Sequence, residues 1–586
     1  MRGALSSTDP YTANAAVPRV IPEREQQIVR DVLQEFSQMY SWRNSGFSGQ
    51  WEEVASLIDP PSRNTFFYGA YNTPGQKKTH QQVDSSGQMA LHRFAAICDS
   101  MLTPRNMQWH QLRANNDYVM KDRLTRLWFE QVTNVLFKYR YAAVANFTGQ
   151  NQNNWRGVGA YGNAAMFVDA LDTRLFGGAR GLRYKAVPMG EMYWRENHQG
   201  QIDGFIRWFK MTAAQAAQKW GIERLPPGLH TALSTNSQFP YQFLHCVRPR
   251  EDYDPQRYDA RALPYGSYYV SIEGQCLMAP ESGYRSLPIA AFRYDEGPGE
   301  VYGRGPAMMV LPALKTLNAQ KATFLKQGHR AADPVLLTAD DGIVDFSMRP
   351  GALNKGGVNA DGRPLVHILP TGDIATNEKM MDMERSLIDD AFLVSLFKLI
   401  LEEKVLTATQ VTEIVNQKGI LIAPTMGKLQ TGLGQMIDRE LDVLAAQNLL
   451  PPMPPRLREA KGDYRVEYTS PLARTQRAGE AAGFMRTVET AKEIANITQD
   501  PAYLDPFDFD TALPDIADIQ GVPESWMAAP DKIAARRKAR AKQQQQQAAI
   551  QAMPAQAAMM KAQATVQKNQ PGIGPNQGIG GPQQGP

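Results

Sequence analysis

The chain has 586 residues, enough for roughly three or four domain-sized units. Its 43% hydrophobic and 21% charged residues are ordinary for a globular protein and exclude a chain that is disordered throughout. The net charge of +4 argues against a dedicated duplex-DNA binder, because such proteins gain affinity from each phosphate that they neutralise. This charge is compatible with a protein that contacts DNA weakly or lets it slide.

The N-terminal part is predicted to be helical after a flexible arm. Residues 1–20 carry turn-forming residues without periodicity, and they lack the apolar core of a signal peptide. A helix should begin after Pro22, since apolar residues from Ile28 to Tyr40 recur at spacings of three and four. Two more helices are predicted over 84–102 and 122–139.

The pattern changes after about Phe167 to short, partly alternating apolar runs that Gly, Pro, Asn and Asp separate. Such runs are typical of antiparallel strands, with one short helix over 211–220 among them. The fold class is therefore α+β, mainly helical. The predicted strands span 184–187, 192–195, 205–210, 243–247, 268–272 and 288–294.

The centre of the chain is predicted to contain two long helices with an insertion between them. The first helix covers 306–329, about 35 Å at 1.5 Å per residue, and the second covers 377–401. The insertion, 335–372, contains short strands and turns. A third helical stretch, 409–450, should be kinked or broken, because one proline and several glycines interrupt it.

The C-terminal part begins with a proline-rich connector at 451–455. A strand is predicted over 464–468 and an amphipathic helix over 474–497. Beyond Asp531 the chain is rich in Lys, Arg, Gln, Ala and Met, and its Ala/Gln part favours a helix. The Gly/Pro-rich end is predicted to be disordered.

The sequence offers little support for catalysis or for a bound cofactor. The nearest approach to a phosphate-binding loop, at 75–79, lacks the second glycine and a preceding strand. H-E-x-x-H, C-x-x-C and G-x-S-x-G motifs are absent. Cys98, Cys246 and Cys276 are far apart, form no zinc motif, and are expected to be small buried apolar residues. The most apolar run, 391–401, is about half a membrane span, so we expect no membrane anchor.

One compact carboxylate cluster, Asp505, Asp508 and Asp510, has two interpretations. The three residues could hold Mg²⁺ for phosphodiester chemistry. They could also belong to a Pro/Asp turn with interleaved aromatic residues. The turn is favoured, because no basic or histidine residue accompanies the cluster in the sequence.

Two groups of basic residues are candidates for contact with DNA. On the first long helix, Lys315 and Lys326 are eleven residues apart and share a face, with Arg330 following them. In a monomer these side chains form a solvated stripe, whereas in a ring each becomes a belt of positive charge. The second group is Arg536, Arg537, Lys538 and Arg540, which could touch phosphates or a charged partner or form a solvated face.

Four segments stand out when they are taken together and in order. They are Trp51-Glu52-Glu53 with Leu57-Ile58-Asp59-Pro60; Val83-Asp84-Ser85-Ser86-Gly87 with Leu102-Thr103-Pro104 and Trp109-His110-Gln111-Leu112; Val301-Tyr302-Gly303-Arg304-Gly305; and Tyr468-Thr469-Ser470-Pro471-Leu472-Ala473-Arg474. In this order they resemble the portal, or head-to-tail connector, family of short-tailed, podovirus-type phages. The resemblance covers roughly residues 25–480.

The resemblance implies a dodecameric ring at one capsid vertex, through which DNA is packaged and later ejected. A tunnel loop over 398–408 would add Lys398 and Lys404 to the channel candidates Lys315, Lys326 and Arg330. The implied regions are a wing (21–300), a first stem helix (301–331), a clip (332–372), a second stem helix (373–397), the tunnel loop, a broken wing helix with a returning strand (409–475), a crown (476–540) and a barrel extension with a disordered tail (541–586).

The implied partners are double-stranded DNA, the terminase motor, the major capsid and scaffold proteins and the tail adaptor or tail tube. The implied location is the virion, after assembly in the host cytoplasm. Two alternatives stay open at this point. One is a scaffold or internal virion protein, which the long helices and Gln-rich tail permit and which should form no closed ring. The other is a metal-dependent virion nuclease using Asp505, Asp508 and Asp510.

Overall fold

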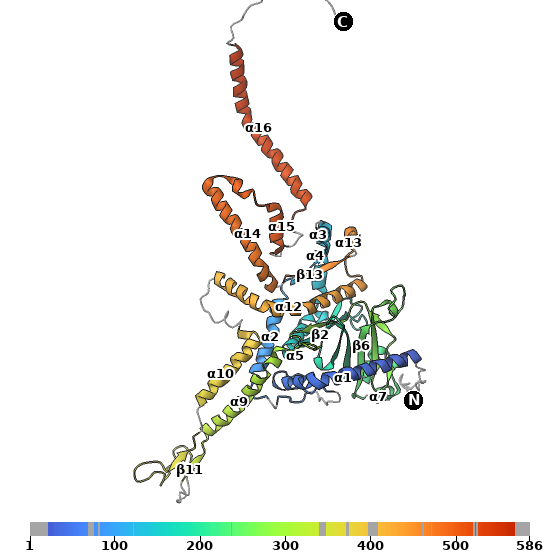
Figure 1. The fold of residues 1–586 in the computed structure, drawn as a ribbon, viewed down its shortest axis with the longest axis vertical. Coiled ribbons are helices and arrows are strands. Elements are labelled where there is room, and N and C mark those ends of the chain that lie inside the picture. Colours follow the sequence, from blue (N-terminus) through green and yellow to red (C-terminus); the bar gives the residue numbers. More distant parts are fainter. Residues whose placement is uncertain are drawn as a thin grey trace, which may run out of the picture.

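The computed structural model describes residues 22–67, 75–79, 82–120, 122–235, 237–338, 347–370, 374–395, 408–459, 462–469, 471–519, 522 and 526–568. These residues form a central body with two extensions (Figure 1). An arm of two helices and a small hairpin projects from one side of the body, and the C-terminal helices extend from the other. The predicted N-terminal arm (1–20) and the tail beyond 568 lie outside the described residues, as does the predicted tunnel loop (398–408) except for Ala408, which begins α12.

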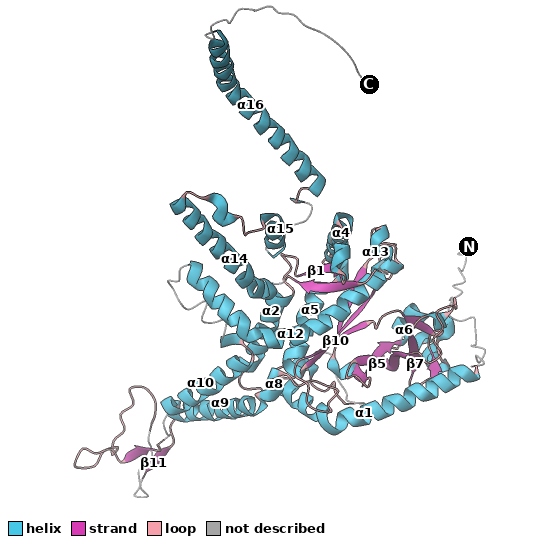
Figure 2. Cartoon of the chain, turned by 45° about the horizontal axis from the view of Figure 1, so that its top comes forward, coloured by secondary structure: helices cyan, strands magenta, loops and turns pink. Residues whose placement is uncertain are grey.

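Helices dominate the described chain, and strands cluster in the body beside the first helix (Figure 2). The helices are α1 (Glu23–Leu57), α2 (Ser86–Leu102), α3 (Asp117–Met120), α4 (Arg123–Arg140), α5 (Phe147–Tyr161), α6 (Ala213–Trp220), α7 (Pro227–Ser234), α8 (Pro306–Met309), α9 (Leu311–Ala332), α10 (Ile374–Ala391), α12 (Ala408–Ala446), α13 (Pro455–Glu459), α14 (Pro471–Thr498), α15 (Phe509–Ile519) and α16 (Pro530–Lys568).

The strands form antiparallel sheets, as the sequence pattern predicts. β4 (Met192–Glu196), β5 (Ile202–Thr212), β6 (Pro240–Pro249), β7 (Tyr265–Ser271) and β8 (Cys276–Leu277) lie in that order, and β9 (Ser282–Tyr284) also pairs with β7. A second sheet has the order β10 (Ile289–Arg293), β2 (Asn163–Ala170), β3 (Leu182–Val187). Two further pairs join β1 (His110–Ala114) to β13 (Tyr464–Tyr468) and β11 (Leu336–Thr338) to β12 (Val366–Ile368).

Helix α1 joins two hydrophobic cores. Its first half buries Val29, Val32 and Phe36 against the sheet that contains β5, β6 and β7. Its second half buries Trp51 and Val54 in the main core, together with α2, α4, α5 and the sheet around β2. Apolar residues at spacings of three and four therefore continue well beyond Tyr40, and the helix is longer than the segment predicted from the sequence.

The stretch 409–450 was predicted to be kinked or broken. The break was wrong, because α12 is continuous and Pro424 lies inside it, and the kink stays a prediction. Tertiary contacts outweigh the local cost of about 1 kcal/mol for each helical glycine. Gly432 lies against the Phe292 ring, where an added Cβ would come within 2.5 Å of that ring. The neighbouring Leu429 and Leu433 are fully buried. The glycine that weakens the isolated helix is thus the residue that permits its close packing.

The three cysteines are buried and free, as expected from the sequence. Burial raises the pKa of Cys246 to about 12, so its thiol stays protonated at neutral pH. Among the described residues, no group of three or more His, Cys, Asp or Glu is arranged to hold a metal ion. None of the described helices combines the length and the apolar character that a membrane span needs.

A buried histidine should make the fold sensitive to acid. His245 stacks on Tyr269 with 4.0 Å between ring centroids and lies 3.0 Å from the Ser267 hydroxyl. Burial, and then the charges of Lys219 and Arg207, hold its pKa well below 6.5. The unfolded chain therefore binds a proton that the folded chain does not, and stability falls as the pH drops below about 6.5.

We expect His245→Gln to lower stability at pH 7 and to reduce this acid sensitivity. The loss of unfolding free energy below pH 6.5 should be smaller in the variant by up to about 1.4 kcal/mol per pH unit. Urea unfolding of both proteins between pH 7.5 and about pH 4.5 measures the difference. The matched control is His198→Gln, because His198 is exposed. If the unfolding free energies of His245→Gln and the unchanged chain fall in parallel with pH, His245 is not the source of the acid sensitivity.

Candidate functional site at the projecting arm

The arm is an antiparallel pair of helices capped by a hairpin (Figure 1). Helix α9 has 22 residues, or about 33 Å, and Asn377 near the start of α10 donates to Gln327 near the end of α9 at 3.2 Å. At the tip, β11 pairs with β12 through the register Leu336↔Ile368. The predicted helix–insertion–helix pattern is confirmed, with a break at Val310 between α8 and α9. The second helix was predicted to reach 401, but α10 ends at Ala391, and Leu393 in the turn that follows has φ +61°. The predicted strand at 343–346 lies outside the described residues.

The base of α9 is fixed to the segment before α2. The Asn318 side-chain oxygen accepts hydrogen bonds from the backbone N–H groups of Val83 (2.7 Å) and Asp84 (3.3 Å). Gly87 permits α2 to approach α9, because an added Cβ would lie 2.5 Å from the Leu314 side chain. The Ile58 side chain lies 2.6 Å from the same Cβ position, so two of the family-like segments meet at Gly87.

Helix α10 is fixed to the same segment by an ion pair. The Arg385 guanidinium donates to Asp84 at 3.2 Å and to Asp382 at 2.8 Å. Burial alone would raise the pKa of Asp84, but hydrogen bonds from Ser86 and Arg385 outweigh burial and hold that pKa below its ordinary value. Asp84 stays ionised at neutral pH and links α10 to the start of α2.

The entry to the arm is a tight junction between Gly162–Asn163 and the segment 302–305. Asn163 donates to the Gly303 carbonyl (2.7 Å) and accepts from the Gly303 N–H (2.8 Å). Gly162 has φ +70°, and a Cβ there would overlap the Arg304 backbone. Tyr302 is 1% exposed and stacks on Trp194 at 5.4 Å. The Tyr-Gly-Arg-Gly segment therefore orients the arm on the body.

The arm carries an exposed apolar stripe beside its buried face. Met381 and Ile388 of α10 are 1% exposed and face the body. Met380, Met383 and Leu387 are 48%, 72% and 53% exposed, and their spacing of three and four places them on one face of α10. At the tip, Leu337 and Ile368 are also exposed. Contiguous apolar surface of this kind is characteristic of protein–protein contacts.

The structure separates the candidate DNA-contacting residues of the arm. Lys315 lies at the base and forms an ion pair with Glu53 of α1 at 2.6 Å. Lys326 and Arg330 are exposed further along α9, towards the hairpin. Lys398 and Lys404 lie outside the described residues. Lys315 and Lys326 share a helix face but have different surroundings, because Lys315 pairs with an acid of α1 and Lys326 lies further along the arm.

The C-terminal basic residues lie on α16, where Arg536, Arg537, Lys538 and Arg540 are exposed. Arg537 donates to both carboxylate oxygens of Asp510, one of them at 2.8 Å. The expectation that no basic residue accompanies the aspartate cluster was therefore wrong. The fold brings Arg537 to Asp510 across 27 positions of the sequence, a pairing that no local pattern indicates.

The aspartate cluster has the geometry of a helix start rather than of a metal site. One Asp508 oxygen accepts from the N–H groups of Asp510 (3.0 Å) and Thr511 (3.3 Å), and the other accepts from the Thr511 hydroxyl (2.6 Å). Asp508 is thus occupied at the first turn of α15, as side chains at helix N-termini commonly are. With Asp510 bound to Arg537, this arrangement agrees with the turn interpretation and not with paired metal ligands.

Sequence reasoning missed the residues that fix the arm, among them Asn163, Asn318 and Arg385. Their partners are 140, 235 and 301 residues away, and no periodicity reports such contacts. The sequence contained only an indirect indication of these contacts. The four family-like segments contain Asp84, Gly87 and Gly303, which are the partners of these missed residues or lie next to them.

Comparison with known proteins gives a family and several relatives. The model of a family described as "Bacteriophage head to tail connecting protein" matches residues 30–527. The "Portal protein" of Salmonella phage epsilon15 is 24% identical over 538 residues, covering 89% of this chain and 92% of that protein. The "Probable portal protein" of Bordetella phage BPP-1 is 25% identical with the same coverage of both chains.

Two solved structures are also similar, at low identity. One, the virion of a native gene transfer agent particle, gives a TM-score of 0.33 at 10% identity, over 68% of this chain and 85% of that one. The other, the neck of an empty gene transfer agent particle, gives 0.35 at 13% identity, over 68% and 86%.

Proposed function

Since the chain belongs to the family of bacteriophage head-to-tail connecting proteins, we propose that it is a portal protein, the subunit of a ring at one capsid vertex. Viral DNA passes through the central hole of this ring during packaging and ejection, and the tail attaches to it. The observation that carries the proposal is the match over residues 30–527, which includes the body, the arm and the helices up to α15. The relatives named portal proteins cover nine-tenths of the same chain.

The surface of the arm provides a physical reason for assembly into a ring. A closed ring of identical subunits needs two different faces that fit each other on neighbouring copies. Met380, Met383 and Leu387 supply apolar surface for one such contact, and burying this stripe against the next subunit removes it from water. We assign α9 and α10 to the stem, β11 and β12 to the clip, and the chain from 476 to 540 to the crown.

The distribution of charge suits a channel through which DNA moves. Each phosphate contact adds affinity, so a ring lined densely with cations would hold the duplex rather than release it. The net charge of +4 and the small number of cations on α9, Lys326 and Arg330 among them, keep such contacts few. We propose that the movement of DNA is driven by a separate terminase ATPase and that this chain has no catalytic role. Capsid, scaffold and tail adaptor proteins are its further proposed partners.

Electron microscopy of the purified chain tests the ring directly. We expect closed rings of about twelve subunits with a central hole, and we expect Met383→Asp to shift the protein towards monomers. The physical reason is that a carboxylate in the subunit contact would lose its hydration without gaining a partner. Thermal unfolding of the monomer should be nearly unchanged, because Met383 is 72% exposed.

The matched control is Asn359→Asp, which also replaces a neutral exposed residue of the arm with a carboxylate but lies outside the apolar stripe. Rings should form normally in this variant. Monomers or open filaments from the unchanged chain under all conditions would argue against the portal assignment and favour a scaffold or internal virion protein. If Met383→Asp still forms rings, the apolar stripe of α10 is not part of the contact between subunits.

The proposed tunnel loop gives a separate prediction. Replacing Lys398 or Lys404 with alanine should alter the packaging or retention of DNA without preventing ring assembly, since each change removes one belt of charge around the channel. The measurement combines ring imaging with the length of packaged DNA protected from nuclease. If the variants fail to assemble, the loop has a structural role and its placement in the channel is wrong.

A further inference from the structure

The two helices of the arm carry opposite charge. Helix α9 has no carboxylate, and its cations are Lys315, Lys321, Lys326 and Arg330. In α10 carboxylates outnumber cations, with Glu378, Asp382, Glu384, Asp389 and Asp390 against Lys379 and Arg385. The helices lie side by side and run antiparallel (Figure 1, Figure 2). The arm therefore combines a basic helix with a mainly acidic one.

These opposite charges do not pair with each other inside the subunit. Lys315 of α9 pairs with Glu53 of α1 at 2.6 Å. Arg385 of α10 pairs with Asp84 before α2 at 3.2 Å. Among the described residues, no ion pair joins α9 to α10, although the two helices pack along their length.

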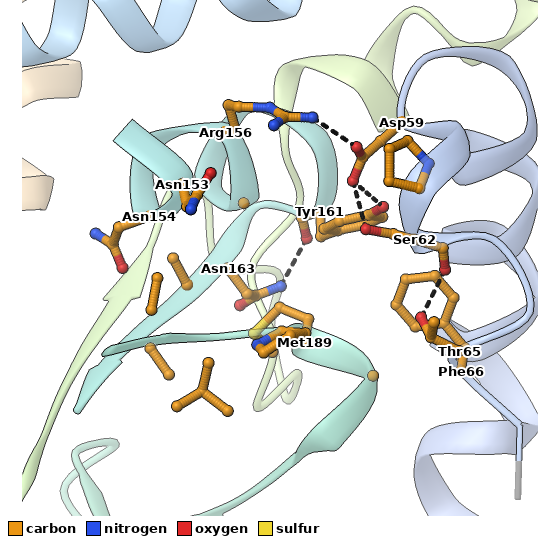
Figure 3. A pocket seen from close by; sticks show the side chains of 18 residues that line it. Asp59, Ser62, Thr65, Phe66, Asn153, Asn154, Arg156, Tyr161, Asn163 and Met189 are labelled. Carbon is orange, nitrogen blue, oxygen red and sulfur yellow. Dashed lines mark hydrogen bonds and ion pairs between the residues drawn. The ribbon is translucent and has the colours of Figure 1, made fainter. Parts of the chain in front are cut away.

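The body, by contrast, pairs charged side chains within the chain. At a pocket between α5 and the turn after α1, Asp59 accepts from the Arg156 guanidinium at 2.8 Å (Figure 3). The Tyr161 and Ser62 hydroxyls donate to the same carboxylate at 2.8 and 2.6 Å. The charge of Asp59 is thus satisfied inside one subunit. The arm instead exposes opposite charges that a second molecule can pair.

The contact between the helices shows where two of these charges lie. Asn377 of α10 donates to Gln327 of α9, so these residues mark the line along which the helices face each other. Lys326 comes one residue before Gln327, and each residue turns the side chain by about 100°. Glu378 comes one residue after Asn377. Because the helices run antiparallel, a step back in α9 and a step forward in α10 turn to opposite sides. Lys326 and Glu378, both exposed, therefore lie at one level on opposite sides of the arm.

Neighbouring residues extend these two sides. Arg330 follows Lys326 by four residues and adds a second cation to the basic side. Asp382 follows Glu378 by four residues and adds a second carboxylate to the acidic side. The exposed apolar stripe lies on the basic side, because Met383 is turned by about 140° from Glu378 around α10. One side of the arm is thus basic and apolar, and the other is acidic.

We propose that the basic side of one arm docks on the acidic side of the next copy's arm, with Lys326 and Arg330 against Glu378 of the partner subunit. This inference rests on the ring proposed above. A closed ring joins two different faces of the subunit. Rotation about the ring axis leaves the height of each residue along that axis unchanged, so charges at one level of the arm meet. The pairing also weakens the attraction of these cations for DNA phosphates, which suits a channel through which the duplex slides.

Two charge reversals and their mixture test this contact in the full-length protein. Lys326→Glu and Glu378→Lys each place like charges at every contact of the ring. Each variant alone should need at least about tenfold more protein than the unchanged chain to form rings. Electron microscopy and sedimentation across a dilution series measure this change. An equal mixture of the two variants should regain rings, because alternating copies place opposite charges at every contact.

The matched control is Lys379→Glu, an exposed residue of α10 that is turned by about 200° from Asn377 and lies on neither side. It should form rings as the unchanged chain does, and all variants should keep its melting temperature. If both reversals alone form rings normally, the contact is wrong and the portal assignment stands. If the mixture forms no rings, the two residues do not meet between copies. If the unchanged chain forms no rings, the portal assignment fails, and this contact fails with it.

Discussion

Replacing Glu440 with alanine is expected to destabilise the folded chain by about 3–5 kcal/mol. Glu440 of α12 accepts from Arg140 of α4 at 3.0 and 2.5 Å and from the Tyr184 hydroxyl at 2.7 Å, and both charged side chains are fully buried. Burial alone would lower the pKa of Arg140, but the Glu440 carboxylate outweighs burial and raises it. Without Glu440, a charge that cannot be neutralised stays in the core.

The remaining neighbours of Arg140 cannot compensate for that loss. Its third contact is the His110 Nε2 at 2.8 Å, and burial, followed by the charge of Arg140, holds the pKa of His110 well below 6.5. His110 is therefore a neutral acceptor. The Trp109 ring lies 4.6 Å from the guanidinium and adds a cation–π contact that is smaller than a buried ion pair.

Urea unfolding at a fixed protein concentration measures the effect. The double variant Arg140→Met with Glu440→Leu should recover most of the lost stability, because apolar residues of similar size often replace a buried ion pair without penalty. The exposed pair Arg257–Asp259 is the control, and Arg257→Ala should be far less destabilising than Glu440→Ala. A cost below about 1 kcal/mol for Glu440→Ala would contradict the assigned role of the pair.

Replacing Arg43 with methionine is expected to cost about 4 kcal/mol, for a different reason. Arg43 is fully buried and forms no ion pair with a carboxylate in the part of the chain that the structure describes. Its guanidinium donates to the carbonyls of Met192 (2.8 Å) and Phe66 (2.8 Å) and to the Tyr193 hydroxyl (2.8 Å), among others. Each acceptor left unpaired in the core costs about 1–3 kcal/mol.

Arg43 joins α1 to the loop around Phe66 and to β4, so its loss should loosen three segments together. Arg43→Lys should be nearly as harmful, because a single ammonium cannot reach acceptors that the planar guanidinium spans. The control is Arg24→Ala in the same helix, an exposed residue bound to Asp252, with an expected cost below 1 kcal/mol. If Arg43→Lys is as stable as the unchanged chain, the guanidinium is not needed to join these three segments.

Local patterns predicted much of the fold. Apolar spacing located α1, α2 and α4, long stretches without helix breakers located α9 and α10, and short alternating runs located β3 to β7 and β10, because these signals arise within a few residues. The alternating apolar pattern did not predict β1 and β2. β1 pairs with β13 across more than 350 residues, and β2 is buried between two strands, where a continuous apolar run shows no alternation.

The functional residues divide in the same way. The sequence determined the type of architecture, two long helices around a short insertion, and through four segments it indicated the head-to-tail connector family that the comparisons confirm. The tertiary structure alone decided that Arg385 and Asn318 fix the arm at Asp84, that Glu53 pairs with Lys315, and that Arg537 pairs with Asp510. Hydrophobic periodicity is a property of one element, whereas an ion pair depends on where the packing of other elements places each charge.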